Sequence, residues 1–225
     1  MLNYLLPVIT FVLCVISFVI LLRDEKTHDK NNEKCNQNKK IPLSKKAMAY
    51  SIIMTLITIG VSILFCTIYK ENGFWISLKR ISLLTMLWPI AYTDFTSYRI
   101  PNPFIILGLT YRIIILPLEV LFDANFVWAT VLSEVIAAGA LFIAAGLCSL
   151  CIKNSIGYGD IKLFIVMGLL LSLDGIWGAI FLSLIISFVI SVYLLITKKK
   201  SQKDTIPFGP AIVIGTYLSV CLSGM

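Results

Sequence analysis

Residues 175–197 read GIWGAIFLSLIISFVISVYLLIT and contain no charged side chain. An α-helix of about 20 apolar residues spans the hydrocarbon core of a bilayer, because it satisfies its backbone hydrogen bonds internally. Residues 4–22, 47–69 and 205–225 are similar uncharged stretches. Of the 225 residues, 58% are hydrophobic and 14% are charged, which is atypical of a soluble domain. The sequence therefore predicts an all-α, polytopic membrane helical bundle.

The expected bundle has about eight transmembrane helices: residues 4–22, 47–69, 76–94, 103–122, 126–151, 161–173, 176–197 and 206–225. Lys and Arg residues indicate their orientation, because cytoplasmic loops are enriched in both. Eight lie in residues 23–46, a segment expected to be a polar, flexible loop, and four lie in residues 198–203. With the N-terminus outside, the inner loops and span ends hold fifteen Lys and Arg and the outer ones three. No basic residue precedes the first span, so we do not expect it to be a cleavable signal peptide.

Several polar features have ordinary explanations. The formal net charge of +7 does not indicate nucleic-acid binding, because the basic residues lie where a membrane protein needs them. Cys148 and Cys151 form one Cys-x-x-Cys pair, whereas a structural zinc site needs four ligands. We therefore expect a lipid bilayer as the surroundings, no nucleic-acid partner, no metal and no cofactor.

Besides Asp94 and Lys162, which lie at the inner ends of their expected spans, five charged residues fall inside expected spans. Lys79 and Arg80 lie near the outer end of their span, where long side chains can extend to the membrane surface. Arg112 and Glu119 are seven positions apart, which allows them to share one helix face. Glu134 is a possible partner for Arg112, and the expected role is a structural ion pair.

Two aspartates stand at the cytoplasmic ends of expected spans. Asp160 lies in Gly157-Tyr158-Gly159-Asp160-Ile161-Lys162, and Asp94 precedes Ile100-Pro101-Asn102 by a few residues. Ionisable groups at membrane depth are costly and usually functional. Asp160 has the alternative explanation of a helix N-cap. Two such carboxylates on the same side of the membrane nevertheless indicate an aspartyl protease.

The chemistry requires two carboxylates close enough to share a proton. One takes a proton from the attacking water, and the protonated partner assists the scissile carbonyl and the leaving amine. Gly157 and Gly159 allow positive φ angles and close approach of another segment. Lys162 could help to neutralise the site, or it could simply flank the inner end of a helix.

These residues resemble those of the type IV prepilin peptidase family, the Gly-x-Gly-Asp intramembrane aspartyl proteases. Asp94 with Ile100-Pro101-Asn102 resembles the first aspartate motif, and Gly157–Lys162 resembles the second. Pro207-Phe208-Gly209-Pro210 resembles the start of the family's last helix. The resemblance implies an endopeptidase of the bacterial cytoplasmic membrane, with its active site facing the cytoplasm, that cleaves leader peptides of prepilins or pseudopilins.

The resemblance also assigns residues. It makes Asp94 and Asp160 the catalytic pair, with Gly157, Gly159, Lys162, Pro101 and Asn102 binding substrate or shaping the site. It gives no chemical role to Pro207, Gly209 or Pro210.

One departure concerns the cysteine-rich methyltransferase domain of bifunctional members. Residues 23–46 contain Cys35 alone and are too short for such a domain. The expected organisation is an N-terminal anchor helix with a short basic cytoplasmic loop (1–46) and a membrane-embedded aspartyl peptidase domain (47–225), without N-methyltransferase activity.

Three alternatives remain. The intramembrane acids could serve an ion-coupled or proton-coupled transporter, although the chain shows no convincing internal repeat. The protein could be a catalytically silent assembly factor for a pilus or secretion machine. It could also be a related protease of the preflagellin or presenilin-like type. The sequence leaves the pilin-like substrate, the pathway served and the oligomeric state open.

Overall fold

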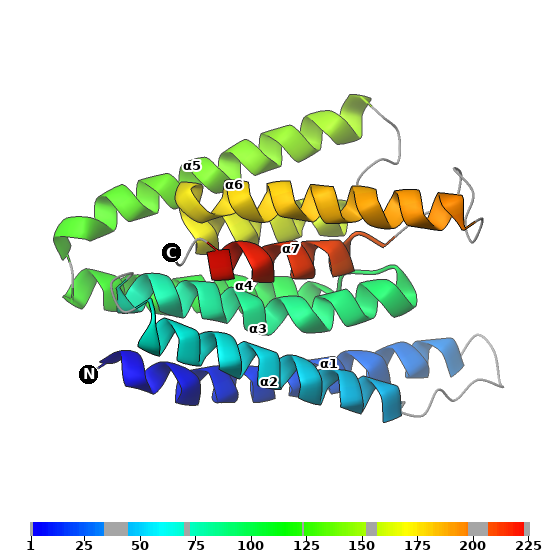
Figure 1. Cartoon of the computed structure of the whole chain (residues 1–225), viewed down its shortest axis with the longest axis horizontal. Coiled ribbons are helices and arrows are strands. Elements are labelled where there is room, and N and C mark those ends of the chain that lie inside the picture. The colour runs from blue at the N-terminus through cyan, green and yellow to red at the C-terminus, as the bar shows by residue number, and fades with distance from the viewer. Residues whose placement is uncertain are drawn as a thin grey trace.

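The computed structural model describes residues 2–33, 45–69, 73–122, 124–151, 157–197 and 207–222. Within these ranges the secondary structure is helical, as expected for an all-α bundle (Figure 1). The elements are η1 (Leu2–Leu5), α1 (Leu6–Glu33), α2 (Lys45–Thr67), α3 (Phe74–Ser97), α4 (Asn102–Phe122), α5 (Ala124–Cys151), α6 (Tyr158–Ile196) and α7 (Gly209–Leu222).

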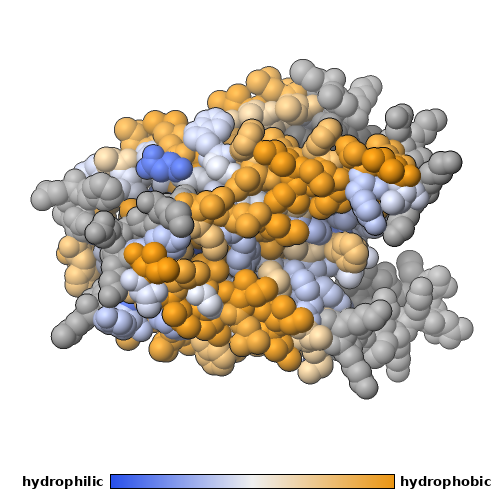
Figure 2. All heavy atoms as spheres, in the orientation of Figure 1, coloured by the Kyte–Doolittle hydropathy of each residue, from blue (hydrophilic) through white to orange (hydrophobic). Residues whose placement is uncertain are grey.

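The helices have the length and composition of membrane spans. Among the described residues, α1, α2, α4, α5 and α6 are long and apolar enough to cross a bilayer, and α7 is a shorter apolar helix. Apolar side chains cover much of the molecular face in Figure 2, and Ile113, Leu121 and Phe188 are among the exposed ones. A surface of this kind is stable in lipid rather than in water. The expectation of a polytopic membrane bundle is confirmed.

Helix α3 lies at the centre of the bundle. It packs against α1, α2, α4, α6 and α7, and its side chains are buried from Ser77 to Ala91. Its composition explains why it is not among the apolar spans, since it carries Lys79, Arg80 and Asp94. Because neighbouring helices surround it, α3 can hold polar groups that a lipid-facing helix could not.

Element α6 spans 39 residues and consists of two helical limbs joined at a non-helical residue, Ser172. At Ser172 the backbone adopts φ 54° and ψ −176°, and Figure 1 shows the chain reversing there. Contacts with the last helix agree. The ring of Phe208 lies 6.1 Å from that of Phe164 in the first limb, while Gly215 packs against Ser183 in the second.

The fold-back places two limbs of α6 across the bundle. The sequence predicts separate spans at 161–173 and 176–197, and the break at Ser172 lies one residue before the end of the first of these ranges. A straight helix of this length would extend about 58 Å, roughly twice the hydrocarbon thickness. The total of eight transmembrane helices stays a prediction.

The prediction of a flexible loop at residues 23–46 is wrong for residues 23–33. Helix α1 continues without interruption to Glu33. Helix-favouring residues such as Glu25 and Lys26 follow the apolar run. An ion pair of 2.7 Å between Asp24 Oδ2 and Arg99 Nη2 ties this extension to the segment after α3. The rest of the expected loop, residues 34–44, lies outside the described residues.

Candidate active site

Asp94 lies in the last turn of α3 and is buried, with 7% of its surface exposed. The helix ends just after it, where Tyr98 adopts a left-handed conformation and donates its backbone N–H to the carbonyl oxygen of Asp94 at 2.9 Å. The side-chain Oδ2 of Asp94 accepts a hydrogen bond of 2.7 Å from the backbone N–H of Gly209. The carboxylate is therefore fixed by a residue of another helix.

Asp160 lies in the first turn of α6 and is partly buried. Its Oδ2 accepts a hydrogen bond of 3.3 Å from the backbone N–H of Gly157, the N-cap residue. The N-cap is thus Gly157, and the expected alternative of Asp160 as the N-cap is wrong. Asp160 occupies the third helical position and reaches back to the N-cap N–H, which is the half of a capping box that a glycine N-cap permits. The other carboxylate oxygen is not used by the cap, which leaves Asp160 able to do chemistry as well.

The structure brings the two aspartates together. Asp160 lies close enough to Asp94 for the negative charge of one carboxylate to act on the other. Helix α7 bridges them, because Gly209 contacts Asp94 while Phe208 packs on Phe164, one turn beyond Asp160. The end of α3 and the starts of α6 and α7 thus meet at one site. Carboxylates that act on each other electrostatically do not ionise independently, which is what acid and base chemistry by the pair requires.

The two glycines of the motif do not use positive φ angles, contrary to expectation. Gly157 has an extended conformation with φ −71°, and Gly159 is helical. The expected close approach does occur at Gly159. A Cβ atom there would lie 3.0 Å from Cβ of Ile100, so the missing side chain lets the segment after α3 pack on the start of α6.

The remaining expected residues make contacts among the neighbouring helix starts. Lys162 Nζ donates a hydrogen bond of 3.2 Å to Asn102 Oδ1, linking the starts of α6 and α4. Pro101 is buried directly before α4, and its carbonyl accepts the N–H of Phe104 at 3.2 Å. These contacts hold the start of α4 beside the start of α6.

Gly209 is the residue that the sequence analysis missed. It is the first residue of α7 and is buried against Asp94. The Pro-Phe-Gly-Pro segment predicted the start of a helix. Nothing local in the sequence, however, indicates that this N-terminus faces a carboxylate 115 positions earlier.

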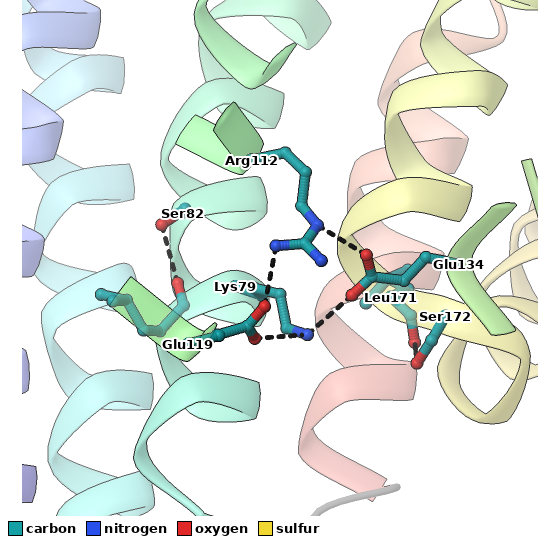
Figure 3. Close-up of polar contacts among 8 residues, drawn as sticks. Lys79, Ser82, Arg112, Glu119, Glu134, Leu171 and Ser172 are labelled. Carbon is teal, nitrogen blue, oxygen red and sulfur yellow. Dashed lines mark hydrogen bonds and ion pairs between the residues drawn. The ribbon is translucent and has the colours of Figure 1, made fainter. Parts of the chain in front are cut away.

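A second polar cluster, the ion ring, consists of Lys79, Arg112, Glu119 and Glu134 (Figure 3). Lys79 Nζ lies 2.9 Å from Glu119 Oε1 and 2.7 Å from Glu134 Oε1. Arg112 Nη1 lies 2.8 Å from Glu119 Oε2, and Arg112 Nε lies 2.5 Å from Glu134 Oε2. The expected ion pair of Arg112 and Glu134 is confirmed. The ion ring as a whole holds two cations and two carboxylates, so its charges balance.

The ion ring corrects the interpretation of the basic residues in α3. Lys79 does not extend to the membrane surface, since its side chain is only 3% exposed, and Arg80 is buried as well. Lys79 finds two carboxylates in the bundle interior, which removes the need to reach water. The ring lies about four helical turns from Asp94 along α3, on the order of 20 Å. It is therefore separate from the candidate active site.

The side chains suited to metal binding are dispersed. Among residues whose placement the structure describes, no group of three or more His, Cys, Asp or Glu is arranged to hold a metal ion.

Comparison with known proteins identifies relatives with peptidase function. The model of the type IV leader peptidase family matches residues 81–196, which include both aspartates. A prepilin leader peptidase/N-methyltransferase from Bacillus subtilis (strain 168) is 30% identical over 149 residues, which cover 65% of this chain and 57% of that protein. No solved structure matches the chain. Because the family model covers about half of the chain, this protein belongs to the type IV leader peptidase family.

Proposed function

We propose that the protein is a membrane aspartic endopeptidase that cleaves the leader peptides of type IV prepilins or pseudopilins. The observation that carries the proposal is the meeting of Asp94 and Asp160 where α3 ends and α6 begins. Membership of a peptidase family supports it, and so does the resemblance to the prepilin leader peptidase of Bacillus subtilis. No observation favours the ion-coupled transporter.

The proposed mechanism uses the two carboxylates in different protonation states. The ionised one removes a proton from a water molecule, which attacks the scissile carbonyl carbon. The protonated one stabilises the carbonyl oxygen and then supplies a proton to the leaving amine. Because adjacent carboxylates do not ionise independently, the pair begins the cycle with one shared proton.

The supporting residues have proposed roles around this pair. Gly159 lets the segment containing Ile100 and Pro101 approach Asp160, and Gly157 caps the helix that carries it. Lys162 and Asn102 join the neighbouring helix starts. We expect these residues to shape the site and to bind substrate rather than to transfer protons.

We propose that the site faces the cytoplasm from within the bacterial cytoplasmic membrane. Basic residues gather at the end of the bundle that carries the aspartates: Arg23 and Lys26 lie in the C-terminal part of α1, Arg99 follows α3, and Lys162 lies near the start of α6. Such enrichment is typical of the cytoplasmic side. A substrate with a basic leader and a long apolar helix would place its cleavage site at this depth, with the helix in the lipid.

The proposed activity does not include N-methylation. The expected loop region offers Cys35 alone and is too short for the cysteine-rich domain of bifunctional members. The chain matches 57% of the length of its Bacillus relative, whose name includes both activities.

The test is cleavage of a panel of prepilin-like substrates by the purified protein in liposomes. We expect one cut per substrate between the basic leader and the apolar helix, located by mass spectrometry of both products. Incubation with labelled S-adenosylmethionine should leave the new N-terminus unmethylated. A folded protein that cuts no member of the panel, yet carries protons or cations across the liposome membrane, would support the transporter instead.

A further inference from the structure

The N-terminus of α7 faces the carboxylate of Asp94. The backbone N–H of Gly209 donates to Oδ2 over 2.7 Å, and both residues are buried. Hydrogen bonds from N–H to a carboxylate strengthen as the carboxylate becomes charged. The positive end of the helix dipole acts in the same direction. The contact therefore both orients the side chain and stabilises negative charge on it.

The contact requires a residue without a side chain. A Cβ atom on Gly209 would lie 2.8 Å from Oδ2, 2.9 Å from Cβ and 3.2 Å from Cγ of Asp94. Two of these distances are shorter than carbon and oxygen atoms tolerate, and one of them involves Cβ of Asp94, which is fixed to the backbone of α3. Any larger residue at position 209 must push the aspartate and the helix start apart.

Helix α7 is held firmly, so its first N–H is a fixed donor. The Tyr217 hydroxyl lies 2.6 Å from Thr58 Oγ1 of α2 and donates to the carbonyl oxygen of Leu84 in α3 at 3.3 Å. On the other side, a Cβ at Gly215 would lie 2.5 Å from the backbone nitrogen of Ser183, so α7 packs directly on the second limb of α6. A donor fixed in this way needs no reorganisation when a reaction occurs.

We propose that Gly209 is a positioning residue of the peptidase site, which holds Asp94 by its backbone N–H and admits it by having no side chain. With Oδ2 bound to Gly209, Oδ1 is the oxygen that faces the reaction. This inference rests on the proposed function, and it assigns a role to a residue outside the two aspartate motifs and outside the matched segment 81–196.

The kinetic test compares three glycine-to-alanine variants. Gly209→Ala should reduce kcat about 100-fold with little change in KM, because a misplaced reacting group costs about this much. Gly139→Ala is the matched control, since a Cβ there meets nothing within 4 Å. Gly215→Ala, on the same helix, represents a purely structural clash and should lower the melting temperature. A Gly209→Ala variant with wild-type kcat, or with a change in KM alone, would overturn the proposal.

A spectroscopic test does not depend on activity or on the folding of the alanine variant. In protein labelled with ¹³C′-phenylalanine and ¹⁵N-glycine, the Gly209 amide is identified by its coupling to the carbonyl carbon of Phe208, because the sequence contains one Phe-Gly pair. Its proton should lie downfield of the amide protons of glycines within helices, and Asp94→Ala should move it upfield. An amide shift that Asp94→Ala leaves unchanged contradicts the proposed contact.

The two tests separate the inference from the proposed function. If the wild type cleaves substrate and Gly209→Ala cleaves it equally well, the positioning role fails while the peptidase stands. If the amide responds to Asp94→Ala but no substrate of the panel is cut, the contact stands and the peptidase proposal fails.

Discussion

Lys162 and Asn102 lie at the margin of the site, where sequence position alone overstates their importance. Lys162 is the second residue after Asp160, yet its ammonium group donates to Asn102 Oδ1 at an exposed position. Exposed hydrogen bonds of this kind contribute little to stability, because water replaces them readily. Their effect on catalysis should be indirect, through the relative placement of the starts of α4 and α6.

Lys162→Met should therefore retain most of the activity. We expect the free energy of unfolding to change by less than about 1 kcal/mol. The cleavage rate should fall by less than about tenfold, and Asn102→Ala should behave alike. Denaturation and cleavage assays on both variants check this. If Lys162→Met lost as much cleavage activity as Asp160→Ala while Asn102→Ala kept its activity, Lys162 would be a catalytic group.

The sequence predicted the aspartates but not their partners. Asp94 and Asp160 were identifiable because a carboxylate at the end of an apolar run has no ordinary reason to be there. Gly209 was not identifiable, because its contact with Asp94 depends on how α7 docks against α3. The assumption of positive φ at Gly157 failed for a related reason, since glycine allows that conformation without requiring it.

At the scale of the helix, α6 stores local strain at its turn. Ser172 has φ 54° and ψ −176°, a region that residues other than glycine seldom adopt. Two contacts stabilise the turn: the Ser172 hydroxyl donates to the carbonyl oxygen of Leu171 at 2.6 Å, and the N–H of Leu173 donates to Ser133 Oγ at 3.1 Å. The first limb can therefore end here and direct both ends of α6 to the same side of the bundle.

Ser172→Gly should stabilise the protein. Glycine tolerates this conformation, so the free energy of unfolding should rise by about 1 kcal/mol, and Ser172→Val should lower it. Ser187 lies inside the second limb, where glycine is unfavourable, so Ser187→Gly should cost about 0.5 kcal/mol. Unfolding of the three variants in detergent measures whether the free energy of unfolding rises for Ser172→Gly and falls for the other two. A destabilised Ser172→Gly would show that the backbone at this turn is not strained.

Helix boundaries were predictable where composition changes and less so elsewhere. Asp174 and Gly175 interrupt an apolar run, and the expected break is close to the observed one. The charged stretch after residue 22 was interpreted as a loop because it leaves the membrane. Its residues nevertheless favour helix, and α1 continues to Glu33.

At the scale of the molecule, the ion ring joins three helices in the half of the bundle away from the aspartates. It takes Lys79 from α3, Arg112 and Glu119 from α4, and Glu134 from α5. Glu134 also lies beside the turn at Leu171 and Ser172 (Figure 3). The sequence predicted the pair of Arg112 and Glu134 but not the membership of Lys79. Whether Lys79 reaches the membrane surface or a buried carboxylate depends on which helices surround α3.

Glu134→Gln should destabilise the bundle strongly. It leaves two buried cations facing one carboxylate, and breaking a buried ion pair typically costs about 3–5 kcal/mol. Lys79→Met combined with Glu134→Gln restores neutrality, so the double variant should lose less than the two single variants together. The measurement is unfolding in detergent. Strictly additive losses would mean that the four residues do not act as one ring.

Glu134→Gln and its combination with Lys79→Met should not abolish peptide cleavage by the molecules that remain folded, because the ion ring lies on the order of 20 Å from Asp94. The cleavage rate per folded molecule of the double variant should stay near that of the wild type. A transporter that used these acids would instead lose its activity with Glu134→Gln, even in the folded fraction.

The most direct measurement is prepilin cleavage by Asp94→Asn and Asp160→Asn, each compared with Asp174→Asn, an exposed aspartate of the same helix as Asp160. We predict that each active-site variant loses about 10²–10⁴-fold in kcat. The double variant should be no worse than either one, because the pair acts as a unit. Asp174→Asn should cleave normally, and all variants should melt as the wild type does. Normal cleavage by a folded Asp94→Asn or Asp160→Asn would contradict an aspartyl mechanism.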